Sequence, residues 1–264
     1  MTQNENRQLF QERLDALGAG CDSRTAERLA IYHTLLEDWN QRVNLTADAT
    51  LETMLDRHYI DSLAPLTVAG LFPQKTKIID VGSGAGFPGL PLAIARPDFE
   101  VLLLDSLQKR LKFLDAVIAE LGLTNVRTAH ARAEDAGHDS ALRERFDMAT
   151  ARAVAAAPTL MELLLPLVKV GGKAVCYKGP SAGDELQAGN RAARMLGGAP
   201  LQTLPVEVPG QPDWQHCVLV SEKRLITPRT YPRKAGTPAK EPLGNTEPEN
   251  HNRNDTAFSG HSRP

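Results

Sequence analysis

Lys77-Ile-Ile-Asp-Val-Gly-Ser-Gly-Ala-Gly-Phe-Pro-Gly89 is an apolar strand that runs directly into a loop with four glycines. A second apolar segment, Val101-Leu-Leu-Leu-Asp105, follows it and ends in an acid. A strand, a turn too tight for side chains and a second strand ending in a carboxylate form a nucleotide-binding βαβ crevice. The glycines allow positive φ angles and a close approach of a ligand, while Asp105 can accept hydrogen bonds from ribose hydroxyls. The pattern therefore predicts a site for an adenosine-containing ligand.

The spacing of the glycines does not by itself distinguish a dehydrogenase from a methyltransferase. Read from Gly84, the loop satisfies G-x-G-x-x-G, which is typical of dinucleotide-binding proteins. Asp80 favours a methyltransferase, because a carboxylate at the tip of the first strand would repel the pyrophosphate of NAD. The same carboxylate suits the ammonium and sulfonium of S-adenosylmethionine. A dehydrogenase would also need a hydride-transfer pair beyond residue 150, and none is evident there.

The balance of charge limits what the surface as a whole can attract. The 264 residues include 30 Lys and Arg against 32 Asp and Glu, for a formal net charge of −2. Any contact with nucleic acid must therefore come from a local basic patch. Cys21, Cys176 and Cys217 are far apart and form no C-x-x-C pair, so we expect neither a disulfide framework nor a metal site. A polar N-terminus without a long apolar segment predicts a cytoplasmic protein that does not enter a membrane.

The order of the elements predicts one α/β sheet with additions at both ends. Helical spacing extends over residues 6–70, and strands and helices then alternate, which predicts a parallel sheet. The expected strands are 77–82, 100–105, 126–131, 146–151 and 172–178, followed by an antiparallel hairpin of 201–208 and 217–221. Helices are expected at about 158–168 and 183–196. We divide the chain into a helical cap (1–72), a cofactor-binding domain (73–222) and a tail (223–264).

The tail differs from the rest of the chain in composition. Residues 223–240 contain six Lys or Arg, three Pro and no acid. This composition fits either a solubilising linker or a clamp that orders on RNA. Residues 244–264 have almost no large apolar side chains, and we expect the last part of the tail to be disordered.

Motifs outside the glycine loop narrow the interpretation. In chain order they include Asn44-Leu-Thr46, Arg57-His58 with Asp61-Ser62, Leu104-Asp-Ser-Leu107 with Lys109-Arg110, Arg152-Ala153 and Lys178-Gly179. With these motifs, over residues 25–243, the chain resembles the bacterial 16S rRNA guanine-N7 methyltransferase G family, also called glucose-inhibited division protein B. The resemblance implies a Rossmann-like, class I S-adenosylmethionine-dependent methyltransferase fold. It also implies methylation of N7 of one guanine in 16S rRNA near the decoding site. Separately from the resemblance, we expect a monomer that uses no metal.

The resemblance further implies which residues contact S-adenosylmethionine. By position in the motifs they are Gly82, Phe87, Asp105, Ser106, Leu107, Ala133, Glu134 and Arg152. Gly82 would admit the ligand to the backbone, Phe87 would close over it, and Asp105 would hold the ribose. Ala133 and Glu134 would flank the adenine, and Arg152 would neutralise the methionine carboxylate. A solvated loop acid remains an alternative for Glu134.

Guanine N7 already carries an in-plane lone pair, so its methylation needs no general base, and we predict no catalytic base. The substrate-side candidates are Arg57, His58 and Lys178, which could contact phosphate or a base edge. His58 could equally be a hydrogen-bonded joint between the cap and the sheet, and a solvated helix face is favoured for Lys109, Arg110 and Lys112. Two other functions stay open: an rRNA-binding assembly factor that retains a cofactor pocket, and a methyltransferase for a small molecule or protein.

Overall fold

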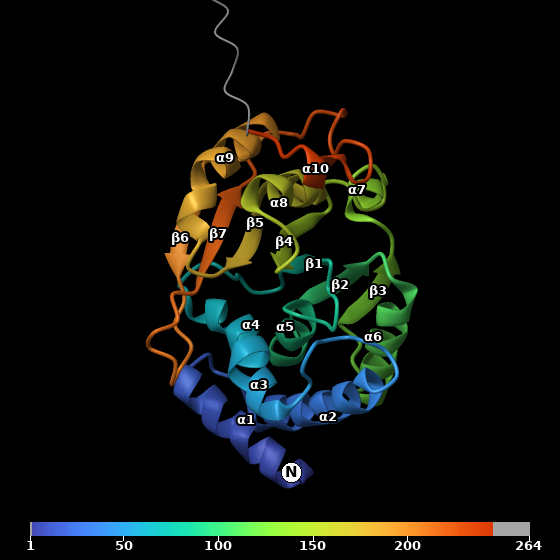
Figure 1. Cartoon of the computed structure of the whole chain (residues 1–264), viewed down its shortest axis with the longest axis vertical. Helices are drawn as coiled ribbons and strands as arrows, with labels where there is room; N and C mark the ends of the chain where they lie inside the picture. Colours follow the sequence, from blue (N-terminus) through green and yellow to red (C-terminus); the bar gives the residue numbers. More distant parts are fainter. Residues whose placement is uncertain (1, 245–264) are drawn as a thin grey trace, which may run out of the picture.

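The computed structural model describes residues 2–244, which form one sheet with helices on both faces (Figure 1). The sheet has the strand order β3-β2-β1-β4-β5-β7-β6. The first five strands in this order run parallel, and β7 lies antiparallel between β5 and β6. The strands are β1 Lys77–Val81, β2 Glu100–Asp105, β3 Val126–His130, β4 Phe146–Arg152, β5 Val168–Lys178, β6 Gln202–Pro205 and β7 Cys217–Glu222. The α/β fold class and the C-terminal antiparallel pair are thereby confirmed.

Helices connect the parallel strands and also build the cap that precedes them. The cap consists of α1 Gln3–Leu17, α2 Ser23–Asn40, α3 Leu51–Met54, the π-helical turn η1 Leu55–Ile60, α4 Asp61–Leu63 and the 3₁₀ turn η2 Ala64–Thr67. The later helices are α5 Gly89–Ala95, α6 Gln108–Glu120, α7 Ala133–Ala136, α8 Ala157–Leu164, η3 Leu165–Leu167, α9 Ala182–Met195 and α10 Thr237–Lys240. The cap covers the face of the sheet that carries α5 and α6, whereas α8 and α9 cover the other face (Figure 1).

The alternation of side chains in the central strands produces two hydrophobic cores. Ile78 and Leu103 point into a core shared with the cap, while Ile79 and Leu102 point into a core shared with α8 and α9. Successive side chains of a strand face opposite sides of a sheet, so a strand buried on both faces reads as a continuous apolar run. The runs at 77–81 and 100–105 are of this kind.

The strand order fixes where a ligand can bind. β1 is flanked by β2 on one side and β4 on the other. The chain therefore adds β2 and β3 on one side of β1 and then crosses over to add β4 and β5 on the other. In open α/β sheets, ligands bind beyond the carboxyl ends of the strands at such a switch point. The glycine loop at 82–89 begins there.

Some element boundaries differ from those expected. β5 begins at Val168 rather than at residue 172, because its first residues continue the sheet beside Phe146 before a register shift. The predicted helix at 158–168 correspondingly ends earlier, as α8 and η3. β6 covers only Gln202–Pro205, whose last residue lies opposite Cys217 of β7, and one further backbone hydrogen bond, from Val206 to the His216 carbonyl, precedes the loop.

The described part of the tail, residues 223–244, is folded onto the domain, so the expectation of a linker or of a clamp that orders only on RNA is wrong for these residues. Lys223 has a fully buried side chain that donates to the Leu165 carbonyl and pairs with Glu144 at 3.1 Å. Arg233 forms a forked ion pair with Glu162, which is fully buried in α8. The composition of the tail did not reveal these contacts, because the acids that pair with Lys223 and Arg233 lie elsewhere in the chain, the partly exposed Glu144 and the buried Glu162. The disorder predicted for the last part of the tail lies outside the described residues.

No helix within residues 2–244 combines the length and the apolar character needed to cross a membrane. The predicted boundaries at 72 and 222 fall before β1 and at the end of β7. The three-part division stays a prediction, because cap residues such as Tyr32 and sheet residues such as Leu103 belong to one continuous core.

Candidate active site

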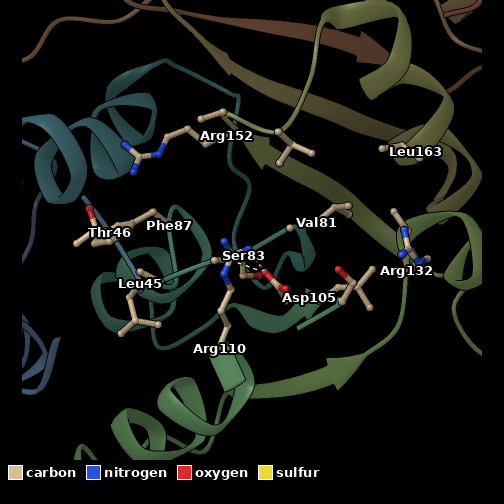
Figure 2. Close-up of a pocket in the computed structure, with 18 of the residues that line it drawn as sticks. Leu45, Thr46, Val81, Ser83, Phe87, Asp105, Arg110, Arg132, Arg152 and Leu163 are labelled. Atoms are coloured by element: carbon tan, nitrogen blue, oxygen red, sulfur yellow. Dashed lines mark hydrogen bonds and ion pairs between the residues drawn. The ribbon is translucent and has the colours of Figure 1, made fainter. Parts of the chain in front are cut away.

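A pocket of about 480 Å³ opens beyond the carboxyl ends of β1, β2 and β4. The cap, the glycine loop, the β2–α6 turn, α7 and the loop after β4 all contribute to its walls. Its lining includes Leu45, Thr46, His58, Gly82, Ser83, Phe87, Asp105, Ser106, Arg110, Arg132, Ala133, Glu134, Arg152, Val154 and Leu163. Figure 2 shows Asp105 and Arg110 near the centre of this site, with Arg152 and Arg132 on opposite sides.

The glycine loop is held by the cap as well as by its own sequence. Gly86 has φ +110°, and a Cβ there would lie 2.6 Å from the Tyr32 hydroxyl. That hydroxyl, fully buried in α2, donates a hydrogen bond to the Ala85 carbonyl. Gly82 has φ +73°, and a Cβ there would lie 2.9 Å from Val154. Glycine is therefore required by conformation and by space, and the backbone stays open to a ligand.

Asp80 does not line the pocket. The expectation that its carboxylate would repel the pyrophosphate of NAD is therefore wrong. Its carboxylate is fully buried and accepts hydrogen bonds from the Gly89 N–H at 3.1 Å and from the Thr150 hydroxyl at 2.8 Å. Burial raises the pKa of Asp80 to about 6. The acid ties the end of the glycine loop to β4, and its contribution to the site is structural.

Asp105 lies on the floor of the pocket with its side chain almost fully buried. Its carboxylate accepts the Gly84 N–H at 2.9 Å and the Leu107 N–H at 2.8 Å, and Arg110 pairs with it at 3.3 Å. A carboxylate has about four acceptor positions. Asp105 therefore joins the glycine loop to the start of α6 and keeps capacity for a ligand hydroxyl.

Phe87 is the centre of an aromatic cluster that links the pocket to the cap. Its ring stacks on Tyr32 with centroids 5.7 Å apart and meets Tyr59 edge-on at 5.0 Å. The Arg152 guanidinium lies 5.2 Å from the same ring, within range of a cation–π interaction. Phe87 thus forms one wall, and its position depends on side chains from α2 and η1.

Arg152, at the end of β4, is fixed by groups of the cap. Its Nη1 donates to the Asp61 carboxylate at 3.0 Å and to the Arg57 carbonyl at 2.9 Å, and its Nη2 donates to His58 Nδ1. Asp61 in turn lies 2.7 Å from His216 Nδ1. An arginine has only donors, so His58 Nδ1 must accept and carries no proton. Burial and the Arg152 charge lower the pKa of His58 to about 4 in agreement with this.

The remaining residues expected at the cofactor differ in their placement. Ser106, Ala133 and Glu134 line the pocket, and the Glu134 carboxylate accepts the N–H of Gly236 at 2.8 Å. Leu107 does not line the pocket. Its side chain is exposed, and only its backbone N–H contributes to the site, by donating a hydrogen bond to the Asp105 carboxylate. Glu134 is therefore tied to the C-terminal part of the chain.

Of the three substrate-side candidates, only His58 lines the pocket. His58 also links the cap to the sheet, through its hydrogen bond with Arg152 at the end of β4. Arg57 is exposed, with its guanidinium 5.9 Å from the Trp214 ring. Lys178 forms a 2.6 Å ion pair with Glu185 and donates to the Ala155 carbonyl, so it braces the loop behind the pocket.

Sequence reasoning missed two arginines at the pocket. Arg110 was assigned to a solvated helix face, but it lines the pocket and pairs with Asp105. Its position five residues after Asp105, in the first turn of α6, was the available signal. Arg132 also lines the pocket with an exposed side chain, and no local pattern distinguishes it from a surface residue.

Comparison with known proteins identifies the family of this chain. The family model described as rRNA small subunit methyltransferase G (GidB) matches residues 25–211. A relative of that name from Clostridium perfringens (strain 13 / Type A) is 43% identical over 235 residues, covering 89% of this chain and 98% of its own. Another, from Lactobacillus johnsonii, is 42% identical over 239 residues, covering 90% of this chain and all of its own.

Among solved structures, a putative S-adenosyl-L-methionine-dependent methyltransferase from Methanococcus maripaludis aligns with 66% of this chain and 90% of its own. The identity is 14% and the TM-score 0.49. The match to the family model covers more than half of the chain, and the curated relatives match almost end to end. The chain therefore belongs to the rRNA small subunit methyltransferase G (GidB) family of S-adenosylmethionine-dependent methyltransferases.

Proposed function

We propose that this enzyme transfers the methyl group of S-adenosylmethionine to N7 of one guanine of 16S rRNA, near the decoding site. The observation that carries the proposal is the pocket itself. In a chain of this family, the open glycine backbone, the Asp105 carboxylate and the Phe87–Arg152 wall meet in one cavity at the switch point of the sheet. A protein that only binds rRNA would not need to maintain this set of groups.

The donor groups of the pocket fit S-adenosylmethionine. Asp105 has acceptor capacity for a ribose hydroxyl, and displacement of Arg110 from its 3.3 Å contact would free a second position. Arg152 keeps N–H groups beyond those bonded to Asp61, Arg57 and His58, and these suit a carboxylate. Gly82, Ser106, Ala133 and Glu134 would supply the backbone and side-chain walls. When bound, the cofactor supplies an electrophilic methyl on its sulfonium.

The chemistry of the acceptor explains why the site can lack a base. N7 of guanine presents a lone pair in the plane of the ring, and it loses no proton when it is methylated. His58, with a pKa near 4 and its Nδ1 bonded to Arg152, is a weak base and suits the role of a neutral wall. The protein's task is to hold N7 in line with the methyl and to exclude water from the pocket.

Labelled methyl transfer tests the proposal directly. Total rRNA that lacks the modification is incubated with the enzyme and labelled S-adenosylmethionine, and the product is mapped by chemical cleavage at N7-methylguanine. We expect one cleavage site, in 16S rRNA near the decoding site. Cofactor binding without transfer to naked rRNA, a partial particle or the assembled small subunit would favour the assembly-factor alternative. Transfer only to a small molecule would favour the alternative of a small-molecule methyltransferase.

We further propose that the protein acts in the cytoplasm as a monomer without a metal, in contact with 16S rRNA or the small ribosomal subunit. Analytical ultracentrifugation at micromolar concentrations should give a single species with the mass of one chain, 28.7 kDa. A dimer would overturn this part of the proposal and leave the chemistry unaffected.

A further inference from the structure

The short helix α7 lies between the pocket and the C-terminal segment, which we define as residues 227–238. On one side, Arg132, Ala133 and Glu134 line the pocket. On the other, Gly137 approaches Pro232 so closely that a Cβ on Gly137 would lie 2.6 Å from Pro232 Cγ. Figure 1 shows the red end of the chain beside α7 and α8.

Hydrogen bonds join the C-terminal segment to α7 and to the turn after it. The Glu134 carboxylate accepts the Gly236 N–H at 2.8 Å, and His138 Nε2 lies 2.7 Å from the Pro232 carbonyl. Arg143 connects the two parts with a single guanidinium. It donates to the Gly137 carbonyl and to three carbonyls of the segment, those of Thr227, Pro228 and Tyr231.

The same segment is anchored to α8, the neighbouring element of the pocket wall. Arg233 donates to both oxygens of Glu162, at 2.9 and 2.7 Å, and Glu162 has a fully buried side chain. The Thr159 hydroxyl donates to the Pro238 carbonyl at 2.9 Å. Leu163, the residue after Glu162, lines the pocket.

We propose that the C-terminal segment positions the α7–α8 side of the cofactor pocket, and that Arg143 and Arg233 are positioning residues for cofactor binding. A helix of one turn is unstable on its own, so the position of α7 depends on what packs behind it. Arg143 and Arg233 do not line the pocket, and both act through the segment they hold. The inference rests on the proposed function, because it assumes that S-adenosylmethionine occupies this pocket.

The test is calorimetric titration of S-adenosylmethionine into the full-length wild type, Arg233→Met and a control, Arg96→Met. Arg96 also forms a fork with a carboxylate, that of the partly exposed Asp98, at 2.8 Å for both contacts, near the amino ends of the strands and away from the pocket. We expect Arg233→Met to raise the Kd about tenfold at full stoichiometry, and the control to leave the Kd unchanged. In methyl-transfer assays, the KM for S-adenosylmethionine should rise with little change in kcat.

The stoichiometry separates positioning from a general loss of folding. If Arg233 only stabilises the fold, the variant will show fewer binding sites or a lower kcat, with unchanged Kd and KM, and the inference is overturned. Arg143→Lys is the milder second variant, because it keeps the charge but loses the fork, and a several-fold higher Kd is expected. If the wild type itself does not bind S-adenosylmethionine, the proposed function of the pocket fails. Binding by the wild type and both variants with equal Kd defeats only the role of the segment.

Discussion

The Asp105 carboxylate is shared between the protein's own groups and the proposed ribose site. We predict that Asp105→Ala weakens S-adenosylmethionine binding by about 1.5–3 kcal/mol, the usual loss for a hydrogen bond to a charged group. The variant should also lose stability, because the N–H groups of Gly84 and Leu107 lose their acceptor. Calorimetric titration measures the first effect and urea unfolding the second. An unchanged dissociation constant would remove Asp105 from the ribose site.

Asp105→Asn is the matched control for that substitution. The amide keeps an oxygen for one backbone N–H but carries no charge for Arg110 and has only one acceptor oxygen. Its cofactor affinity should lie between those of the wild type and Asp105→Ala. Affinity equal to that of Asp105→Ala would mean that the negative charge, rather than the number of acceptors, decides binding.

His33 should make stability fall as the solution becomes acidic. Its side chain is fully buried in α2, and burial lowers its pKa from 6.5 to about 4. The unfolded chain therefore binds the proton more readily between these pH values. The contribution of His33 is complete above about pH 6.5 and is lost as the pH falls towards 4, at most about 3 kcal/mol. Tyr59, 3.4 Å from Nδ1, and Glu37, 3.5 Å from Nε2, are the polar groups that face the ring.

Urea unfolding at about pH 7.5 and about pH 5 measures this effect. His33→Gln should lose less stability over this interval than the wild type, because it has no proton to gain at this position. His58 has the same kind of pKa shift in both proteins, so its contribution cancels in the comparison. Equal losses in the two proteins would contradict the assignment to His33.

The methyl-transfer step should be nearly independent of pH. N7 loses no proton, and the pKa of His58 near 4 places its titration below the working range. Under single-turnover conditions with saturating substrates, the rate should be flat from about pH 6.5 to about pH 9. A log-linear rise of the rate with pH would show that a proton must leave before transfer, and the mechanism would be wrong.

Among the elements, α2 supports the glycine loop from outside the sheet. The Tyr32 hydroxyl donates to the Ala85 carbonyl in a fully buried position, so Tyr32→Phe leaves that carbonyl without a donor. We expect a loss of about 1–3 kcal/mol in the free energy of unfolding and a several-fold weaker affinity for S-adenosylmethionine. Tyr59→Phe is the control, because the Tyr59 hydroxyl has only a long 3.4 Å contact with His33. Equal cofactor affinity in both variants would mean that α2 does not tune the loop.

Deletion of the tail, residues 223–264, is not a suitable test of its contribution to RNA binding. Removal of residues from 223 onward would also take away Lys223 and Thr227, which are buried in the domain. It would further free Glu134 at the pocket, so cofactor affinity would change as well. Point substitutions of exposed cations are therefore the appropriate test of RNA binding by the tail.

For the whole molecule, a net charge of −2 means that RNA must be attracted by local patches. Arg229 and Lys234 are exposed cations on the C-terminal segment, and Lys234 lies two residues before Gly236. The double variant Arg229→Gln/Lys234→Gln should reduce the slope of log affinity for rRNA against log salt by about 1.4–1.8, if both residues contact phosphates. The Kd for S-adenosylmethionine should stay unchanged.

Lys75→Gln/Lys169→Gln is the control with the same change of charge. Both lysines are exposed at the amino ends of the strands, at the edge opposite the pocket. Their substitution should leave the salt slope unchanged. A wild-type slope in Arg229→Gln/Lys234→Gln would place the RNA surface elsewhere, with Arg57 on the cap as the next candidate.

The sequence by itself determined the features that depend on near neighbours. Apolar runs ending at Gly82 and Asp105 predicted the central strands and the ligand crevice, because strand burial and glycine turns are local properties. The motifs that carry the resemblance predicted the family. The antiparallel pair near Cys217 was also predicted from its own residues, although β6 is shorter than expected.

Only the tertiary structure decided which partner each polar group meets. Asp80 lies outside the pocket and accepts hydrogen bonds from Gly89 and Thr150. Arg110 lines the pocket, and Lys178 forms an ion pair with Glu185. The basic tail folded because Glu144 and Glu162, far away in the chain, neutralise Lys223 and Arg233. The physical reason is that the energy of a charge depends on burial and on groups within a few ångströms, and the fold brings those groups together from distant segments.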